Sequence, residues 1–598
     1  MCGIAGIIGD YNKEDQISFK KLMSHRGPDG FGDYETEHFC FAHSLLKIMD
    51  LSENSKQPMI DQINGNVIIF NGSIYNYKDL KKTFFPNDKF YSNTDTEVLL
   101  YMYRKFGLSF LQYIKGMFAI AIFDKKKKKI FIFRDRFGIK PIFFFHNFNT
   151  FIFASEIKIL IKNRIIKSSI KPEFQEIIKF IANRQIYGFD KTLIKNIHIL
   201  QPGGFVEYDL NLKNFQIKKY YEEDQKLIFN QNLEIGGFEK LFNETVKYHT
   251  ITEHNKIACL LSGGLDSSLL SIVLKEQSAG KEIHVFSSLL NKPNEENENI
   301  PKLIKDYNFF GHYIQEDNIN FFEEHINTIK HLDQPTPDAS TTIHNVLCRE
   351  VSKNGFKVLF TGNGGDENFF GYPLHSYGYL ADLIKKGKVL KFFNKIGLIK
   401  NFYKNKFVFF RSMKELINRD ILNRFKQQQL TRRISHLDID IDKNIIKFYE
   451  NLSNDIFKNI VLNYKSHWGL QSFLDYEDKN SMAYGVECRV PFLYEDINKF
   501  VNSINIDQHF EIGPKSLIRK HNKLPNYIKN KSKFAFAANL YGYLDKELNN
   551  MIEKINDEFR EIPLINTKKL IDLSKNKSSY DIFFRTYSYG LWYNNIFK

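Results

Sequence analysis

Cysteine is scarce in this 598-residue chain, and its five residues form no pattern typical of a disulfide or a zinc site. They make no CxxC pair and none of the Cys and His spacings of structural zinc. Four of them lie in apolar strand-like or helical stretches, where a free cysteine is usually a small buried hydrophobe: Cys40, Cys259, Cys348 and Cys488. We therefore expect neither disulfides nor structural metal, and only Cys2 stands apart.

Long apolar runs are also missing. No uninterrupted apolar stretch is long enough to cross a bilayer, and no charged segment followed by an apolar one indicates an export signal. The composition, 43% hydrophobic and 26% charged, is typical of a globular protein. We expect a cytoplasmic protein that does not insert into a membrane.

An acidic excess is absent as well, because 84 Lys and Arg residues against 69 Asp and Glu give a formal charge of +15. A basic chain can bind nucleic acid, but here the Lys residues are spread along the whole sequence. The one dense run, residues 125–129, lies between two β-like segments and is typical of a solvated turn. We expect no nucleic-acid partner. A basic protein that binds RNA or modifies tRNA is the alternative, and salt-sensitive tRNA binding would support it.

The length predicts at least two large domains. Up to about residue 210, β-branched and aromatic runs such as 118–123 and 130–133 alternate with turns, and one helical stretch interrupts them at 95–106. This pattern predicts stacked sheets with flanking helices. We place the first domain at residues 2–210 and a linker at 211–231.

The second domain is expected at residues 232–598. From residue 256, strands alternate with helices, which predicts an α/β fold with a parallel, doubly wound sheet. Ligands of such sheets collect at the carboxyl ends of the strands. Residues 376–470 look mainly helical and are interpreted as an appendage.

Cys2 follows only Met1, and a small residue at this position generally permits removal of the methionine. The thiol would then lie beside a free α-amine, which titrates near neutrality and can act as the general base for its own side chain. Taken alone, a cysteine at position 2 is more often incidental. The sequence motifs in the surroundings of Cys2 therefore determine whether it is interpreted as a nucleophile.

Those surroundings contain seven ordered blocks, which are MCGIAGIIGD at 1–10, HRGPDG at 25–30, FNGSIYNY at 70–77, NTDTE at 93–97, GMFAIAIFD at 116–124, RDRFGIKP at 134–141 and FASEIK at 153–158. In this order they resemble the class II glutamine amidotransferase domain. The resemblance implies an α+β fold, the αββα sandwich of amino-terminal nucleophile hydrolases. It also implies hydrolysis of glutamine through a thioester, with release of ammonia.

The same resemblance implies roles for individual residues. Cys2 would attack the amide carbon of glutamine, and Asn71 with the N–H of Gly72 would form the oxyanion hole. Asp95 would bind the α-ammonium group of glutamine. Arg26 would belong to a loop that closes over the pocket.

Two glutamine-binding side chains of that family are replaced here. The Arg that usually holds the α-carboxylate is Leu45, and the Glu that usually follows the Asn-Gly pair is Ser73. Lys47 lies two residues after Leu45, so in a continuous strand it would face the same side and could substitute in part. We therefore predict glutamine use with weakened binding, and we place Ser73 and Lys47 in the glutamine pocket.

A second motif, LLSGGLDSS at 260–268, follows a strand and opens a helix. Backbone N–H groups of such a turn can surround a phosphate. No Lys-Ser/Thr pair follows the second Gly, which excludes a Walker A loop. Asp266 lies inside the turn, where Mg²⁺ between its carboxylate and pyrophosphate is the natural interpretation. The ATP-binding residues expected in this segment are Leu260, Ser262, Gly263, Gly264, Asp266 and Ser267.

This motif is similar to the loop of ATP pyrophosphatases, and FTGNGGDENFFGY at 360–372 resembles a signature of the glutamine-hydrolysing asparagine synthetase family. The resemblance implies cleavage of ATP between its α- and β-phosphates, with Asp366 as the second metal carboxylate. Lys515, in the KSLIR block, would stabilise charge on the α-phosphate. The remaining ATP-binding residues implied by the family are Ser288, Thr361 and Gly362.

The acceptor side is less fully specified. Residues 333–340 and 481–493 also fit the family and are expected to line it. Asn363 stands where the family has an acidic residue that has been assigned to adenylate formation or to the acceptor pocket. An amide bonds an ammonium group less strongly than a carboxylate does. The sequence therefore does not determine which carboxylate substrate is the acceptor.

The first expectation is a glutamine-dependent asparagine synthetase. It would convert aspartate, ATP and glutamine, with Mg²⁺, to asparagine, AMP, pyrophosphate and glutamate. One alternative keeps this chemistry on another carboxylate, such as a uronic acid of a surface polysaccharide. Another is an ammonia-dependent synthetase with an impaired glutaminase. A homodimer is among the expected assemblies.

Overall fold

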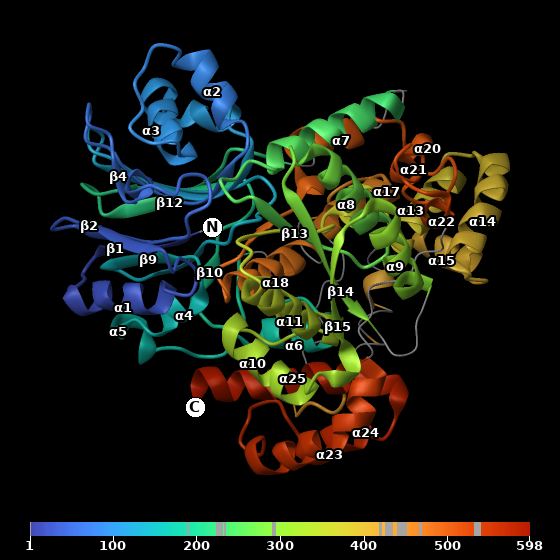
Figure 1. Ribbon diagram of the computed structural model, residues 1–598. Helices are drawn as coiled ribbons and strands as arrows, with labels where there is room; N and C mark the ends of the chain where they lie inside the picture. The colour runs from blue at the N-terminus through green and yellow to red at the C-terminus, as the bar shows by residue number, and fades with distance from the viewer. Residues whose placement is uncertain are drawn as a thin grey trace.

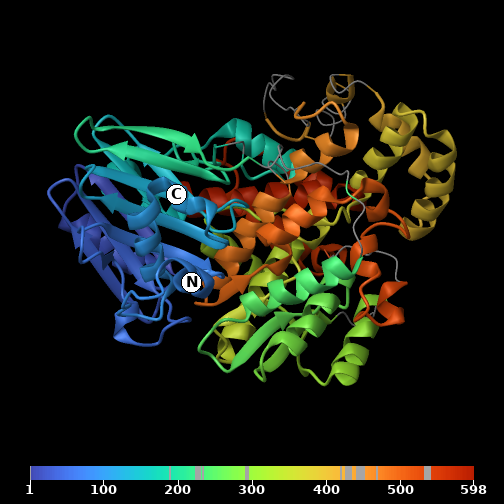
Figure 2. The same cartoon turned by 90° about the horizontal axis from the view of Figure 1, so that it is seen from above.

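The computed structural model contains three β-sheets with flanking helices (Figure 1). It describes residues 2–187, 190–222, 231, 235–289, 295–417, 421–424, 428, 434–438, 451–465, 469–530 and 540–598. Parts of the expected linker and of the expected helical appendage lie outside these residues. Figure 2 shows the amino-terminal sheets, in blue, at one end of the molecule and the yellow helices α14 (Val389–Tyr403) and α15 (Val408–Glu415) at the other.

Two antiparallel sheets of six strands form the amino-terminal part. The first has the order β10 (His198–Ile199), β8 (Phe143–His146), β9 (Thr150–Ala154), β1 (Gly3–Gly9), β3 (Phe39–Leu45), β2 (Gly30–Glu35). The second has the order β12 (Asn214–Lys219), β11 (Gly204–Asp209), β7 (Lys129–Arg134), β6 (Gly116–Asp124), β5 (Val67–Ile74), β4 (Met59–Ile60).

Alternating side chains give these sheets an inner and an outer face. Ile4 and Ile8 of β1 pack between the sheets, where they meet Ile69 of β5. Ala5 and Ile7 of β1 pack on the outer side against helices. The covering helices are α1 (Lys13–Met23), α4 (Ile157–Ile161) and α6 (Phe174–Asn183) on the first sheet, and α2 (Tyr77–Phe84) and α3 (Asp95–Phe106) on the second. The expected αββα sandwich is confirmed.

The third sheet is parallel throughout. Its order is β15 (Phe310–Gln315), β14 (Glu282–Leu289), β13 (Lys256–Leu260), β16 (Val358–Phe360), β17 (Glu487–Arg489). Ile257 and Cys259 of β13 face the side covered by α8 (Leu265–Gln277), whereas Ala258 faces the side covered by α11 (Ala339–Lys353). This is the expected doubly wound arrangement, with the short edge strand β17 as an addition to the strands we anticipated.

Two of the hydrophobic clusters include residues from both halves. The carboxy-terminal helix α25 (Tyr580–Phe597) packs against α6 of the amino-terminal part, and Arg585 Nε donates to the carbonyl of Ile181 at 2.6 Å. Burial of apolar area on both sides of this contact fixes the halves relative to each other. Within the described residues, no helix combines the length and apolarity that a membrane span requires.

Candidate functional sites

The start of β1 and the end of β5 meet around Cys2. The backbone N–H of Cys2 donates to Asn71 Oδ1 at 3.1 Å. The Nδ2 of Asn71 is buried and has no hydrogen-bond partner within the described residues, so this donor remains available to a ligand. A Cβ on Gly72 would lie 2.1 Å from the carbonyl oxygen of Met117, so only glycine fits there. These are the positions we predicted for a nucleophile and an oxyanion hole.

A cavity opens beside this cluster and is lined by Cys2, Leu45, Lys47, Gly72, Ser73, Asp95 and Glu487, among others. Cys2 is 8% exposed, and burial raises the pKa of its thiol. Burial therefore favours the neutral thiol, and a neighbouring base would assist its ionisation during attack.

Asp95 begins α3 directly after the N-cap residue Thr94, and its Oδ2 accepts from the N–H of Ile74 at 2.8 Å. Burial, with a further contribution from the charge of Glu487, raises the pKa of Asp95 to about 7. A carboxylate kept out of water gains strongly when an ammonium group binds to it. This agrees with the predicted place of Asp95 next to the α-ammonium group of glutamine.

Arg26 lies in the turn between α1 and β2, where its side chain is fully buried and held by three partners. It donates to the Cys2 carbonyl at 3.1 Å, to Glu156 at 2.8 Å and to Asp478 of the other half at 2.9 Å. Arg26 therefore fixes the domain interface behind the nucleophile. Its predicted part in a loop that closes over the pocket stays a prediction.

Lys47 lines the same cavity as Leu45, where we placed it, although β3 ends at Leu45 and strand alternation does not by itself account for its position. Its Nζ donates to Glu53 at 2.8 Å, and its carbonyl accepts from His254 at 3.0 Å. A substrate carboxylate would have to compete with Glu53 for this ammonium group.

The expected ATP-binding residues gather in a second cavity of about 480 Å³ at the carboxyl ends of β13, β14 and β16. Its lining includes Leu260, Ser262, Gly264, Asp266, Ser267, Ser288, Thr361, Gly362, Asn363, Asp366 and Lys515. Gly263 lies in the same turn with φ of +72°, a conformation that favours glycine. Within the turn, the hydroxyls of Ser262 and Ser267 are 3.0 Å apart, at the start of α8. This edge is where a doubly wound sheet binds its ligands.

Lys515 joins the two predicted metal carboxylates. Its Nζ pairs with Asp266 and, at 2.5 Å, with Asp366. Although burial opposes the charge, these two carboxylates raise the pKa of Lys515 above its usual value. Two carboxylates that reach one cation also suit Mg²⁺, which proteins usually bind through one or two carboxylates together with substrate phosphates. The residues present therefore fit an Mg²⁺–ATP site.

Glu477 is a site residue that sequence reasoning missed. It lies on α18 (Leu470–Met482), is 4% exposed, and accepts from Asn363 Nδ2 at 2.8 Å and from the hydroxyl of Thr361. Burial raises the pKa of Glu477 to about 7. This carboxylate stands beside the amide that replaces the family's acidic residue. Glu477 and Asn363 are 114 residues apart in sequence, so no local sequence pattern predicts their contact.

The block at 481–493 is also placed differently from the expectation. We expected it to line the acceptor side, but Glu487 in this block lines the cavity of Cys2. Its neighbour Cys488 points the other way and contacts Thr361, with Sγ 3.8 Å from Oγ1. Strand β17 therefore supplies one residue to the Cys2 cavity and contacts, through the next residue, Thr361 of the ATP cavity.

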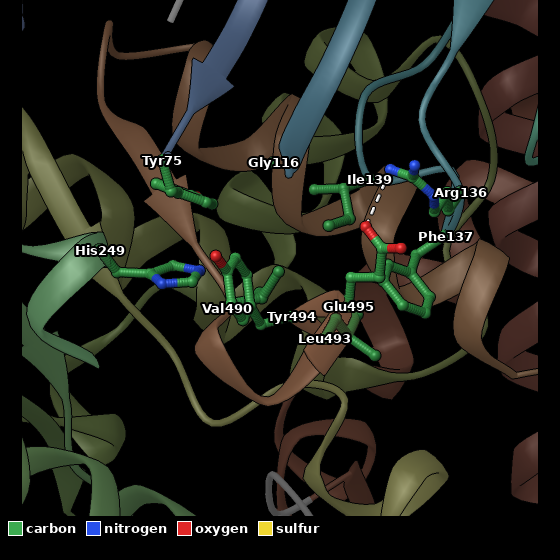
Figure 3. Close-up of a pocket in the computed structure, with 10 residues that line it drawn as sticks. All are labelled: Tyr75, Gly116, Arg136, Phe137, Ile139, His249, Val490, Leu493, Tyr494 and Glu495. Atoms are coloured by element: carbon green, nitrogen blue, oxygen red, sulfur yellow. Dashed lines mark ion pairs between the residues drawn. The ribbon is translucent and has the colours of Figure 1, made fainter. Parts of the chain in front are cut away.

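A small internal cavity of about 10 Å³ lies between the halves close to β17. Figure 3 shows its wall, with Tyr75 from the end of β5 near His249, and Val490 and Tyr494 following β17. The rings of Tyr75 and His249 are 3.8 Å apart, and the ion pair between Arg136 and Glu495 spans 3.1 Å. Such a volume holds about one small molecule the size of water.

A cavity around a buried thiol in an αββα sandwich and a cavity at a Gly-rich turn of a parallel sheet, in one chain, agree with a ligase that carries its own amidotransferase domain. Residues 1–221 match the glutamine amidotransferase domain family, and residues 237–594 match the asparagine synthase family. The chain belongs to the asparagine synthase family and is an enzyme of the ligase class.

Three relatives illustrate the range of this similarity. Asparagine synthetase [glutamine-hydrolyzing] 3 of Bacillus subtilis is 25% identical over 97% of this chain and 94% of its own length. Asparagine synthetase [glutamine-hydrolyzing] 2 of the same organism is 30% identical over 62% of this chain and 52% of its own length. Amidase chry2 of Gibberella zeae is 25% identical over 62% of this chain and 60% of its own length. The names of the relatives therefore do not agree on a single product.

Proposed function

We propose that this protein is a glutamine-dependent asparagine synthetase. The observation that carries the proposal is that one chain holds a cavity around Cys2 and a second cavity around the Gly-rich turn, linked through β17, where Glu487 lines the first cavity and Cys488 contacts Thr361 of the second. Ammonia released at the first site would then be used at the second. The relatives named as glutamine-hydrolysing asparagine synthetases support the same assignment.

The first half-reaction takes place at Cys2. After removal of Met1, the α-amine of Cys2, held by Asn71 Oδ1, would take the thiol proton. The sulfur attacks the amide carbon of glutamine, and the resulting oxyanion accepts hydrogen bonds from Asn71 Nδ2 and the N–H of Gly72. Ammonia leaves, and water hydrolyses the thioester to glutamate.

The second half-reaction takes place at the Gly-rich turn. The β-carboxylate of aspartate attacks the α-phosphorus of ATP, which gives the acyl-adenylate and pyrophosphate. Lys515 lies where it can stabilise the charge that develops on the α-phosphate. Mg²⁺ held by Asp266 and Asp366 would neutralise the charge of the departing pyrophosphate. Ammonia then attacks the acyl carbon and releases AMP.

The acceptor is tested by incubating the enzyme with ATP, Mg²⁺, glutamine and a panel of carboxylates. We expect aspartate to give one AMP for each asparagine, as measured by nucleotide analysis and product mass. Uronic acids, which lack an α-ammonium group, are expected to give no product. AMP formation with a uronic acid in place of aspartate would contradict the proposed acceptor and favour the polysaccharide alternative.

Glu477 supplies a second test of the acceptor. Because its pKa is about 7, its carboxyl is mostly neutral below that pH and ionised above it. Only the ionised form binds the α-ammonium group of aspartate strongly, so the KM for aspartate in ATP–pyrophosphate exchange should fall as pH rises from about 6 to about 8. We expect Glu477→Gln to remove this dependence and to raise the KM roughly 10-fold to 100-fold at high pH.

The exchange assay needs no nitrogen donor, so changes at the Cys2 site do not affect it. Glu477→Asp keeps a carboxylate and should keep a pH-dependent KM. A wild-type KM that does not vary over this pH range, or a Glu477→Gln enzyme with wild-type behaviour, would remove Glu477 from the acceptor site.

A further inference from the structure

The wall of the Cys2 cavity is built by both halves of the molecule. Cys2, Gly72, Ser73 and Asp95 come from the amino-terminal sandwich, whereas Glu487 comes from β17 of the parallel sheet. The Ser73 hydroxyl donates to Glu487 Oε1 at 3.1 Å across the domain boundary. The glutamine site is therefore completed by a residue 414 positions away from Ser73.

Glu487 reaches the cavity as an anion. It is 1% exposed, and Arg489 Nε donates to its Oε1 at 2.6 Å. Although burial opposes the charge, the positive charge at the amino terminus and, after it, Arg489 and Lys140 lower the pKa of Glu487 to about 2. The pair with Arg489 favours the ionised form of this buried carboxyl.

Two further carboxylates, Asp50 and Asp95, line the same cavity. Asp50 accepts backbone N–H groups from Ser52 at 2.8 Å and from Asn93 at 2.9 Å, which engage both of its oxygens. Asp95 faces the same space as Glu487, and the charge of Glu487 contributes to the raised pKa of Asp95. Two buried carboxylates that repel each other across a cavity create a strong site for a small cation.

We propose that Glu487 binds the α-ammonium group of glutamine together with Asp95, so that the parallel-sheet domain supplies part of the glutaminase substrate site. This inference rests on the proposed function, because it takes glutamine as the nitrogen donor. Ser73 positions Glu487 instead of contributing a carboxylate of its own. Glutamine is then bound productively only when the two halves are docked, since neither half holds the complete site.

The strand that carries Glu487 also connects this site to the ATP site. Cys488, the next residue, contacts Thr361, and Thr361 donates to Glu477. A chain of side-chain contacts therefore joins the strand that carries Glu487 to a residue that lines the ATP cavity. This arrangement suits an enzyme that should release ammonia only when the acceptor half is in place.

The test uses the full-length enzyme with Glu487→Gln. We expect the KM for glutamine to rise roughly 10-fold to 100-fold, because a charge-assisted hydrogen bond to the substrate is lost. The KM values for ATP and for ammonia as the nitrogen donor should stay at wild-type level. Wild type should also prefer glutamine over glutaramate, which is glutamine without its α-ammonium group, and this preference should shrink in the variant.

Two further variants separate substrate binding from a structural role. Asp496→Asn removes another carboxylate that crosses the boundary, paired with Lys115 at 2.7 Å, and should leave the glutamine KM unchanged. Ser73→Glu in the Glu487→Gln background returns a carboxylate from the opposite wall and should recover part of the glutamine affinity.

The proposal is overturned if Glu487→Gln keeps the wild-type KM for glutamine and the wild-type preference over glutaramate. It is also overturned if ammonia-dependent synthesis falls in parallel with glutamine-dependent synthesis and Ser73→Glu restores neither. A wild-type enzyme that makes asparagine from ammonia but hydrolyses no glutamine would instead refute the nitrogen donor of the proposed function, and this inference with it.

Discussion

Cys2→Ala is expected to lower glutamine hydrolysis by at least about 10⁴-fold while ammonia-dependent asparagine synthesis stays at wild-type level. The thiol is the only group in the proposed mechanism that forms a bond to the amide carbon, and no other cysteine lines that cavity within the described residues. The ATP cavity does not include Cys2, so its chemistry should not depend on the thiol.

The measurement compares glutamate release with asparagine formation from glutamine and from ammonium chloride. Cys40→Ala provides a matched control, because Cys40 is buried in β3 of the same sheet and lies in the hydrophobic core away from the cavity. Equal loss of the glutamine- and ammonia-dependent activities in Cys2→Ala would contradict the division of labour between the two cavities. It would point to a structural role for this residue.

Lys515→Gln is expected to have the opposite pattern. Synthesis of asparagine from either nitrogen source should fall by roughly 10²-fold to 10³-fold, as happens when one preorganised donor to a developing charge is removed. Glutamine hydrolysis should continue, because Lys515 is not part of the Cys2 cavity. Lys515 forms ion pairs with both Asp266 and Asp366, the two predicted metal carboxylates. It is therefore placed beside the phosphates that those carboxylates would bind through Mg²⁺.

The assay follows aspartate-dependent pyrophosphate release together with glutaminase activity in the same preparation. Lys520→Gln is the matched control, since Lys520 lies one helical turn further along and pairs with Glu511 instead. Pyrophosphate release at the wild-type rate in Lys515→Gln would exclude the proposed role. Loss of glutaminase activity to the same extent would indicate misfolding.

The sequence was sufficient for the features that are local. Asn71 and Gly72 are neighbours within strand β5, so the strand itself fixes their mutual positions. The residues of the Gly-rich turn also come from one block, and a tight turn between β13 and α8 fixes theirs. The same holds for the three sheets, since the change from isolated β runs to alternating strands and helices follows from hydrophobic periodicity. The family confirmed for the chain agrees with the motifs that were recognised.

The partners of the predicted side chains were harder to predict. Lys47 lines the cavity, but its position was argued from strand alternation, and β3 already ends at Leu45. Arg26 is held by Glu156 and Asp478, which lie 130 and 452 residues away in sequence, so no local pattern indicates these ion pairs.

The sequence by itself therefore determined the fold class, the nucleophile candidate Cys2 and the Gly-rich turn around Asp266, because each depends on neighbours along the chain. Only the tertiary structure decided which distant carboxylates lie at the two cavities. Glu477 reaches Asn363 from helix α18, and Glu487 reaches Ser73 across the domain boundary. Such contacts depend on strand register and on how two apolar surfaces dock, and neither is encoded in the spacing of residues within one segment.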